Sequence, residues 1–192
     1  MRHTQNIFTI ANILSHEECQ AYIALTEQAG YIAATINTNK GFELRPDIRN
    51  NERVILDDFK IAKNLWQRVS DQIPPVLEGR QALGLNERFR FYRYDVGQYF
   101  APHYDGAFRR DNGEQSLLTF MIYLNDDFDG GETDFGEITI KPETGMALVF
   151  AHHLLHEGCA VTKGRKYVLR SDVMYGRVGL LTSNPPLFLK RY

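Results

Sequence analysis

The hydrophobic residues of this 192-residue chain follow two different periods. In two stretches of the first 87 residues they recur three or four positions apart, which is the spacing of an amphipathic helix. From Phe89 onward they occur in short runs of aromatic and β-branched side chains, which Gly and Asp clusters interrupt as turns interrupt strands. The pattern predicts helices first and a β-rich part after them.

Two helices are predicted in the first part. Ser15 and Glu18 have the spacing of a capping box, and the helical period that follows stops at Gly30. A second amphipathic stretch runs from about residue 57 to residue 73 and ends at two prolines, which cannot continue a helix. We expect both helices to cover one sheet, with Trp66 in the core.

The second part predicts a sheet core. Strands are expected near residues 89–94, 117–124, 138–140, 146–150 and 167–174. A two-sheet jelly roll, also called a double-stranded β-helix, accommodates such a set and can hold a small ligand inside. The predicted fold class is mainly β with flanking helices (α+β): a jelly-roll core supported by N-terminal helices.

A chain of this length usually forms one domain, here 1–192. We expect residues 1–87 to supply helical support and a lid loop, residues 88–176 the jelly-roll core, and residues 177–192 a C-terminal tail. The tail has an apolar run at 184–189, which is expected to pack on the body or on a second subunit. The oligomeric state stays open, and a dimer is compatible with the sequence.

Two polar segments are candidate lids over a ligand site. Residues 35–53 form a long, weakly periodic stretch, and residues 108–113 form a second one. Long loops of compact domains often carry function. Arg49 and Arg53 lie in the first segment, within reach of a substrate, but we expect them to face solvent as partners of Glu52 or Asp57.

Composition limits the classes of partner. With 43% hydrophobic and 12% aromatic residues the chain can bury a substantial core, whereas a net charge of -2 and a pI near 6.3 give no broad positive field. A nucleic-acid partner is therefore not expected. Cys19 and Cys159 are too few for a disulfide framework, and we expect two free thiols.

The first residues lack the long apolar run of a signal peptide, and no segment has enough consecutive apolar residues to span a bilayer. We therefore expect a soluble, cytoplasmic protein without a membrane partner.

One cluster of residue types indicates a metal site. His103 and Asp105 are two positions apart at the end of a strand-like segment, so they share one face and can converge on an ion, and His156 follows downstream. Two imidazoles and one carboxylate are the ligands of non-haem Fe(II) oxygenases, and they leave coordination positions open for a co-substrate and O2. The alternative is a hydrogen-bonded His103–Asp105 pair at a strand end.

His152 and His153 compete with His156 for the third ligand position. On a helix, His152 and His156 would lie one turn apart. The preceding residues 145–150 have the pattern of a strand, but spacing alone excludes neither competitor.

A cation lies ten positions beyond His156. In the strand expected after Gly164, Lys166, Val168, Arg170 and Asp172 share one face. Next to a buried metal, the Lys166 ammonium can anchor the far carboxylate of a dicarboxylate that chelates the metal at its other end. Arg170 is the rival anchor, because its guanidinium binds carboxylates through two hydrogen bonds.

Over most of its length the chain resembles the 2-oxoglutarate-dependent Fe(II) dioxygenases, and among them the prolyl 4-hydroxylase-like branch. The resemblance rests on three segments in the family's order, which are residues 94–105, residues 119–135 and residues 156–166. It implies that His103, Asp105 and His156 bind iron, since the family's last histidine lies ten positions before its lysine. One departure is Ala160, where the family commonly has proline, and it weakens an assignment to the collagen-type subgroup.

The resemblance also implies a co-substrate site. Lys166 would hold the 5-carboxylate of 2-oxoglutarate and Tyr94 would hydrogen-bond the same molecule, with Tyr123 as a further contact. Arg170 would then have a supporting or substrate-binding role. Thr133 and Phe135 are expected to line the floor of the cavity.

By this resemblance the chain is expected to be a dioxygenase that uses Fe(II), 2-oxoglutarate and O2, with ascorbate as an auxiliary reductant. It would hydroxylate an unactivated C–H bond and release succinate and CO2. A peptidyl proline is the preferred substrate, and a free amino acid or another small molecule is the alternative, because fold and ligands do not choose the substrate. A nucleic-acid demethylase would need a basic groove that the composition does not show. The alternative of another class is a non-catalytic jelly-roll module that binds metal or 2-oxoglutarate.

Overall fold

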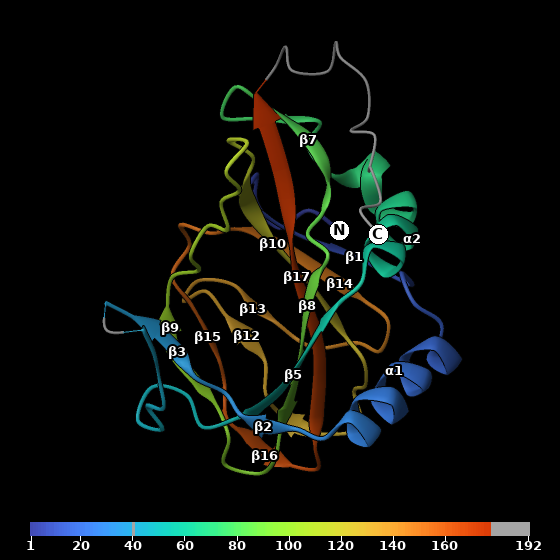
Figure 1. Cartoon of the computed structure of the whole chain (residues 1–192). Coiled ribbons are helices and arrows are strands. Elements are labelled where there is room, and N and C mark those ends of the chain that lie inside the picture. Colours follow the sequence, from blue (N-terminus) through green and yellow to red (C-terminus); the bar gives the residue numbers. More distant parts are fainter. Residues whose placement is uncertain (40, 178–192) are drawn as a thin grey trace, which may run out of the picture.

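The computed structural model describes residues 1–39 and 41–177, and its strands form the predicted jelly roll (Figure 1). The apolar run predicted to pack at 184–189 lies outside the described residues. Within the described part, the largest sheet has nine strands. In order across this sheet they are β1 (Ile7–Ile10), β14 (Ala147–Ala151), β10 (Gln115–Tyr123), β17 (Lys166–Arg177), β8 (Arg88–Tyr94), β5 (Glu52–Asp57) and β2 (Ile32–Ala33), while β7 (Arg80–Leu85) pairs with β17 and β6 (Val76–Leu77) pairs with β7.

A smaller sheet faces the large one across the interior. Its order is β13 (Thr139–Ile140), β12 (Thr133–Asp134), β15 (His156–Gly158) and β9 (Phe100–His103). Two short antiparallel pairs complete the described strands: β11 (Asp129–Gly130) with β16 (Val161–Lys163), and β3 (Ile36–Thr38) with β4 (Gly41–Glu43). In Figure 1 the smaller sheet and the β3–β4 hairpin lie on one side of β17, and the helices lie on the other.

Both faces of the large sheet are buried, each under its own hydrophobic cluster. Alternate residues of a strand point to opposite faces, so each strand contributes to both clusters. In β8, Phe89 and Phe91 belong to the hydrophobic cluster that the helices cover, whereas Tyr92 and Tyr94 belong to the cluster between the two sheets. Val168 of β17 joins this second cluster, and its neighbour Leu169 joins the first. Every second residue of these central strands therefore faces the interior of the jelly roll.

Both predicted helices are present on the outer face of the large sheet. Helix α1 (His16–Ala29) has the predicted capping box: the Ser15 hydroxyl accepts from the Glu18 amide, and the Glu18 carboxylate accepts from the Ser15 amide. Helix α2 (Phe59–Val69), followed by a 3-10 turn (Ser70–Gln72), is shorter than predicted, since Asp58 is its N-cap and Asp57 ends β5. Trp66 packs against the core as expected.

Residues 1–87 contribute more than helices and a loop. Strands β1, β2, β5, β6 and β7 come from this part and join the large sheet, and the polar segment 35–53 contains the β3–β4 hairpin. The sequence did not predict them because each is at most six residues long. A two-residue period does not stand out over so few positions.

The structure also describes the two cysteines and the length and apolar character of the helices. Cys19 and Cys159 are free thiols. Among the described residues, neither helix has the length and apolar character needed to cross a membrane.

Candidate metal centre

His103 and His156 come together because two strands of the smaller sheet pair. His103 ends β9, His156 begins β15, and the antiparallel register places the two residues directly opposite each other. Their ring centroids are 4.3 Å apart. Asp105 follows two positions after His103, and its carboxylate lies 3.8 Å from His103 Nε2 and 3.7 Å from His156 Nε2. One possible ligand atom from each residue lies within 4.8 Å of the others.

Backbone carbonyls fix which ring nitrogens are free to bind a metal. His103 Nδ1 lies 2.8 Å from the Ala101 carbonyl oxygen, and His156 Nδ1 lies 3.0 Å from that of Leu154. Because a carbonyl oxygen only accepts, each Nδ1 must carry the proton. Each Nε2 therefore presents a lone pair toward Asp105, and the second nitrogen is held as metal-binding histidines usually are.

The ionisation states suit a cation. Burial, and to a smaller extent the nearby His156, lowers the pKa of His103 to about 4. Burial also lowers the pKa of His156. Burial alone would raise the pKa of Asp105, but the charge of Arg170, together with the two histidines and the Thr119 hydrogen bond, outweighs burial, and the pKa lies well below its usual range. Near neutral pH the site therefore offers two neutral imidazoles and one carboxylate.

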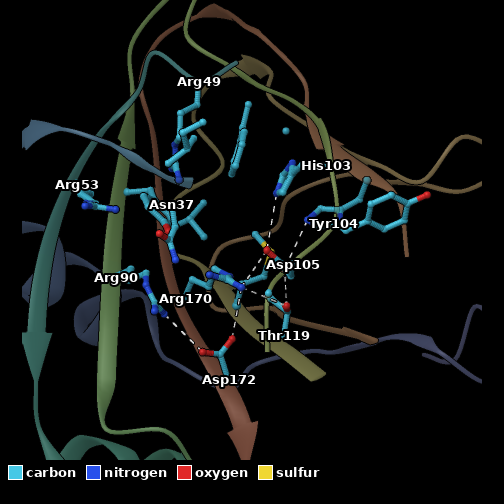
Figure 2. Close-up of a pocket in the computed structure, with 18 of the residues that line it drawn as sticks. Asn37, Arg49, Arg53, Arg90, His103, Tyr104, Asp105, Thr119, Arg170 and Asp172 are labelled. Carbon is cyan, nitrogen blue, oxygen red and sulfur yellow. Dashed lines mark hydrogen bonds and ion pairs between the residues drawn. The ribbon is translucent and has the colours of Figure 1, made fainter. Parts of the chain in front are cut away.

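Each oxygen of Asp105 has a polar partner. Thr119 on β10 donates a hydrogen bond to Oδ2, and Arg170 on β17 forms an ion pair with Oδ1, at 3.0 Å from Nη2 (Figure 2). The threonine has one hydroxyl proton and gives it to Asp105, so it accepts from His152 Nδ1, 3.0 Å away. His152 Nε2 in turn lies 2.9 Å from the Ser116 hydroxyl. A chain of hydrogen bonds thus orients the carboxylate.

These hydrogen bonds distinguish His152 from His156 as a candidate for the third ligand position. Both ring nitrogens of His152 are engaged in them, and the residue stands outside the cluster of possible ligands. His153 is exposed. Residues 152–154 form a turn rather than a helix, which is why the one-turn spacing of His152 and His156 does not apply. The donor set that remains, two nitrogens and one oxygen on one side of an ion, fits Fe(II) with open positions.

Lys166 is buried beside this centre. Its side chain is 2% exposed, its ammonium lies 2.6 Å from the Gly131 carbonyl, and it faces the rings of Tyr94 (5.1 Å) and Tyr123 (5.6 Å). Among the described residues it has no carboxylate at ion-pair distance, and burial lowers its pKa to about 8. A buried cation without a counter-ion fits a ligand carboxylate.

Of the remaining predicted residues, some line the cavity and others contact the metal-ligand candidates. The Tyr123 hydroxyl lies 2.7 Å from the hydroxyl of Thr133, which lines the cavity as expected. Phe135 instead packs its ring against His156 and Phe150. Arg170 does face the cavity with Lys166, but it contacts the metal-ligand candidate Asp105 and also Asp172, at 3.4 Å.

The cavity has a volume of about 680 Å³, and both candidate lids contribute to its wall. The first supplies Thr35, Ile36, Asn37, Phe42, Ile48, Arg49 and Arg53, and the second supplies Phe108. Whether either segment moves as a lid stays a prediction.

The expectation for Arg49 and Arg53 was wrong. Arg49 is only 5% exposed, bonds Asn51, and lies over the rings of Tyr92 and Phe100. Arg53 bonds Thr35, and both arginines line the cavity. The expected partners, Glu52 and Asp57, bind arginines of β8 instead. The strand register places Arg93 opposite Glu52 and Arg88 opposite Asp57.

Sequence reasoning also missed Thr119, Tyr92 and Arg90 as neighbours of the site. A signal was present for all three, because residues two positions apart in a strand share one face. Thr119 shares a face of β10 with Tyr123, and Arg90 and Tyr92 share a face of β8 with Tyr94.

Comparison with known proteins points to one family. The model of the 2OG-Fe(II) oxygenase superfamily matches residues 89–171. Prolyl 4-hydroxylase 1 of Arabidopsis thaliana is 25% identical, over 84% of this chain and 66% of its own length. Probable prolyl 4-hydroxylase 10 of the same plant is 28% identical, over 81% of this chain and 64% of its own length. The chain therefore spans just under two thirds of the length of these curated relatives.

Solved structures share the fold. The viral collagen prolyl hydroxylase of Paramecium Bursaria Chlorella virus-1, solved with 2OG, has 25% sequence identity and a TM-score of 0.64 over 88% of this chain and 96% of its own. A prolyl hydroxylase from Trichoplax adhaerens, in complex with a peptide fragment of hypoxia inducible factor, has a TM-score of 0.68 at 18% identity, over 88% of this chain and 84% of its own. At that identity the second likeness concerns the fold alone.

Proposed function

Because this chain belongs to the 2OG-Fe(II) oxygenase superfamily, in its prolyl 4-hydroxylase-like branch, we propose that it hydroxylates a peptidyl proline with Fe(II), 2-oxoglutarate and O2, releasing succinate and CO2. The observation that carries the proposal is one cavity with two features. His103, Asp105 and His156 converge on it as a facial set of metal ligands, and the buried, unpaired cation Lys166 opens on the same space.

The residues would divide the work as follows. His103, Asp105 and His156 would hold Fe(II), and Lys166, with Tyr94 and Tyr123 around its ammonium, would hold the far carboxylate of 2-oxoglutarate. When bound, these groups supply the oxidising chemistry, which couples decarboxylation of 2-oxoglutarate to hydroxylation of a C–H bond. Ascorbate is proposed as the reductant that keeps the iron in its ferrous state.

The protein itself contributes orientation and a dry pocket. The Ser116–His152–Thr119 chain fixes one oxygen of Asp105, and Arg170 fixes the other. The aromatic rings of Phe150 and Phe135 pack against His156 and limit the access of water to the ligands.

Peptidyl proline is proposed because the curated relatives are named prolyl 4-hydroxylases and the viral structural neighbour is named a collagen prolyl hydroxylase. A second candidate is a free amino acid or another small molecule. It is supported by the cations that line this 680 Å³ cavity, since they suit a small charged ligand.

The first experiment is an anaerobic titration of the metal-free protein with Fe(II) and 2-oxoglutarate, followed by the visible charge-transfer band of the chelate. We expect the band in the wild type and in His153→Ala, whose exposed histidine is the matched control, and its loss in His156→Ala. Admission of O2 with proline peptides should then give succinate and hydroxyproline. Bound metal without succinate for any substrate would favour the non-catalytic module.

A further inference from the structure

Three arginines from three neighbouring strands face the cavity on the large sheet. Arg53 lies on β5, Arg90 on β8 and Arg170 on β17 (Figure 2). The register places Arg90 directly opposite Arg170, and Arg53 opposite Tyr92, two residues along β8 from Arg90. The three guanidinium groups therefore gather on one wall of the pocket.

This arrangement is unfavourable without a compensating anion. Like charges directly opposite each other on an antiparallel pair destabilise the sheet. Arg90 and Arg170 share one carboxylate, that of Asp172, at 3.5 Å and 3.4 Å. Arg170 also contacts Asp105, but Arg90 has only the long contact to Asp172 as an ion pair within the described residues. Arg90 is thus weakly neutralised.

Arg53 is less well neutralised than Arg90. Its Nη atoms bond the carbonyl and hydroxyl oxygens of Thr35, both uncharged. Its Nε is buried and has no hydrogen-bond partner. No carboxylate of the described chain lies at ion-pair distance, and burial lowers the pKa of Arg53. Each Nη carries two N–H groups and makes one of these contacts, so the guanidinium retains donors for a ligand.

The charges of the whole cavity point the same way. In the described residues that line it, two carboxylates face six cations: Arg49, Arg53, Arg88, Arg90, Lys166 and Arg170. Arg88 is neutralised outside the cavity by Asp57, at 2.8 Å. The charges of Fe(II) and of the 2-oxoglutarate dianion cancel each other, so loading the site leaves the positive excess in place.

Tyr92 lies in the positive field of the same arginines. Burial raises the pKa of its hydroxyl, but the charges of Arg49, Arg170 and Arg90 outweigh burial and the net pKa is lowered. Arg49 itself has another role, because it is stacked on Phe100, whose ring stacks on His103 at 3.5 Å. The cations left for a ligand are Arg53 and Arg90.

We propose that Arg53 and Arg90, with the side-chain amide of Asn37 on β3, which lines the same cavity (Figure 2), form a subsite that binds a carboxylate of the substrate. The subsite rests on the proposed function, for which it names a substrate class. The carboxylate belongs either to a glutamate or aspartate beside the target residue of a peptide or to a free amino acid. Arg53 supplies its unpaired donors, and Arg90 supplies charge that Asp172 only partly balances.

The test measures binding without turnover. Protein loaded anaerobically with Fe(II) and excess 2-oxoglutarate is titrated by calorimetry with three pairs of probes, each pair differing in one carboxylate. The pairs are a capped proline peptide with one glutamate beside the proline against its glutamine counterpart, L-proline against L-prolinamide, and N-acetyl-L-alanine against its amide. The first two distinguish the two sources of the carboxylate, and the third is independent of proline.

We expect the wild type to prefer the carboxylate in at least one pair by about 10-fold or more, as charge-assisted hydrogen bonds imply. Arg53→Gln and Arg90→Gln should reduce that preference to about 2-fold or less. Arg80→Gln on β7, outside the cavity, also loses one positive charge and should keep the preference. Unchanged binding of 2-oxoglutarate shows that each variant is folded.

Each outcome is decisive. Equal binding within every pair, or a preference that survives in both arginine variants, overturns the subsite. Hydroxylation of the glutamate and glutamine peptides with equal efficiency, together with equal binding within the other two pairs, overturns the subsite but leaves the proposed hydroxylase intact. An arginine-dependent preference for N-acetyl-L-alanine alone, without binding of a proline probe, supports the subsite and overturns proline as the substrate.

Discussion

At the scale of single residues, the site holds neutral imidazoles and an ionised carboxylate within a few ångströms of one another. Burial keeps His103 and His156 neutral, whereas Arg170, together with the two histidines and the Thr119 hydrogen bond, keeps Asp105 ionised despite burial. A metal requires both conditions, because it binds the neutral imidazole and the deprotonated carboxylate. Lys166 is charged without a protein counter-ion, and this makes it dependent on a ligand.

Removal of one ligand should abolish metal binding. We expect His103→Ala and Asp105→Ala each to lose stoichiometric Fe(II) and turnover together, because two of three ligands do not hold the ion in place. Metal analysis after anaerobic gel filtration measures this, with His153→Ala as the control. Full iron content and activity in either variant would contradict the ligand assignment.

Removal of the buried cation should act on the co-substrate instead. We expect Lys166→Ala to bind 2-oxoglutarate about 10- to 100-fold more weakly, as loss of a charged hydrogen bond in a buried site implies, with iron binding preserved. Lys163→Ala, whose side chain is 82% exposed, is the control. Unchanged affinity in Lys166→Ala would transfer the anchoring role to Arg170.

The same lysine predicts a pH dependence. Burial lowers the pKa of Lys166 to about 8, and only its protonated form pairs with a carboxylate. Below that pKa the ammonium is already charged, but above it binding must take up a proton. We expect the Kd for 2-oxoglutarate to rise by up to about tenfold per pH unit above pH 8. Lys166→Arg stays charged and should lack this rise; an identical rise in both proteins would assign it to another group.

At the scale of elements, the turn between β11 and β12 positions Lys166. Gly131 has φ +68, a conformation that L side chains rarely adopt, and its carbonyl accepts the lysine hydrogen bond. A Cβ at this position would lie 3.1 Å from Lys166 Cδ and 3.0 Å from a ring carbon of Phe128. The turn therefore couples backbone conformation to the co-substrate site.

Gly131→Ala should both destabilise the protein and weaken 2-oxoglutarate binding, because the new methyl group displaces the lysine. Gly136→Ala is the matched control: Gly136 has φ +87, but a Cβ there meets no atom within 4 Å. We expect the control to lose only about 1–2 kcal/mol of stability to backbone strain. Thermal unfolding and calorimetry separate the two effects, and equal 2-oxoglutarate affinity in both variants would contradict this coupling.

At the scale of the whole molecule, ligands should stabilise the fold. The two sheets enclose a cavity in which the buried Lys166 lacks a counter-ion until 2-oxoglutarate binds, so the ligand-free protein carries an electrostatic cost. Metal and 2-oxoglutarate bind the folded state, and their binding energy adds to its stability.

We expect the Tm to rise when Fe(II) and 2-oxoglutarate are added together under nitrogen. The gain should be about 2.7 kcal/mol for a ligand present at 100 times its Kd. In Lys166→Ala, at the same concentrations, the contribution of 2-oxoglutarate should be much smaller. An equal Tm with and without both ligands in the wild type would show that they do not bind the folded protein.

The sequence by itself determined the features that depend on local spacing. The capping box of α1, the strands β8, β10, β14 and β17, and the shared face of Lys166 and Arg170 follow from periods of 3.6 and 2 residues. The His103–Asp105 spacing indicated the metal site for the same reason. The resemblance to a family then selected His156, which spacing alone did not.

Tertiary structure decided which charges meet. Glu52 and Arg53 are adjacent in β5, so their side chains point to opposite faces and cannot pair, and the strand register brings Arg93 to Glu52 instead. Arg53 is thereby left on the cavity wall beside Arg90, and Arg170 is brought to Asp105. These partners lie on strands far apart in the chain. Their meeting depends on the pairing of whole strands, which no local period encodes.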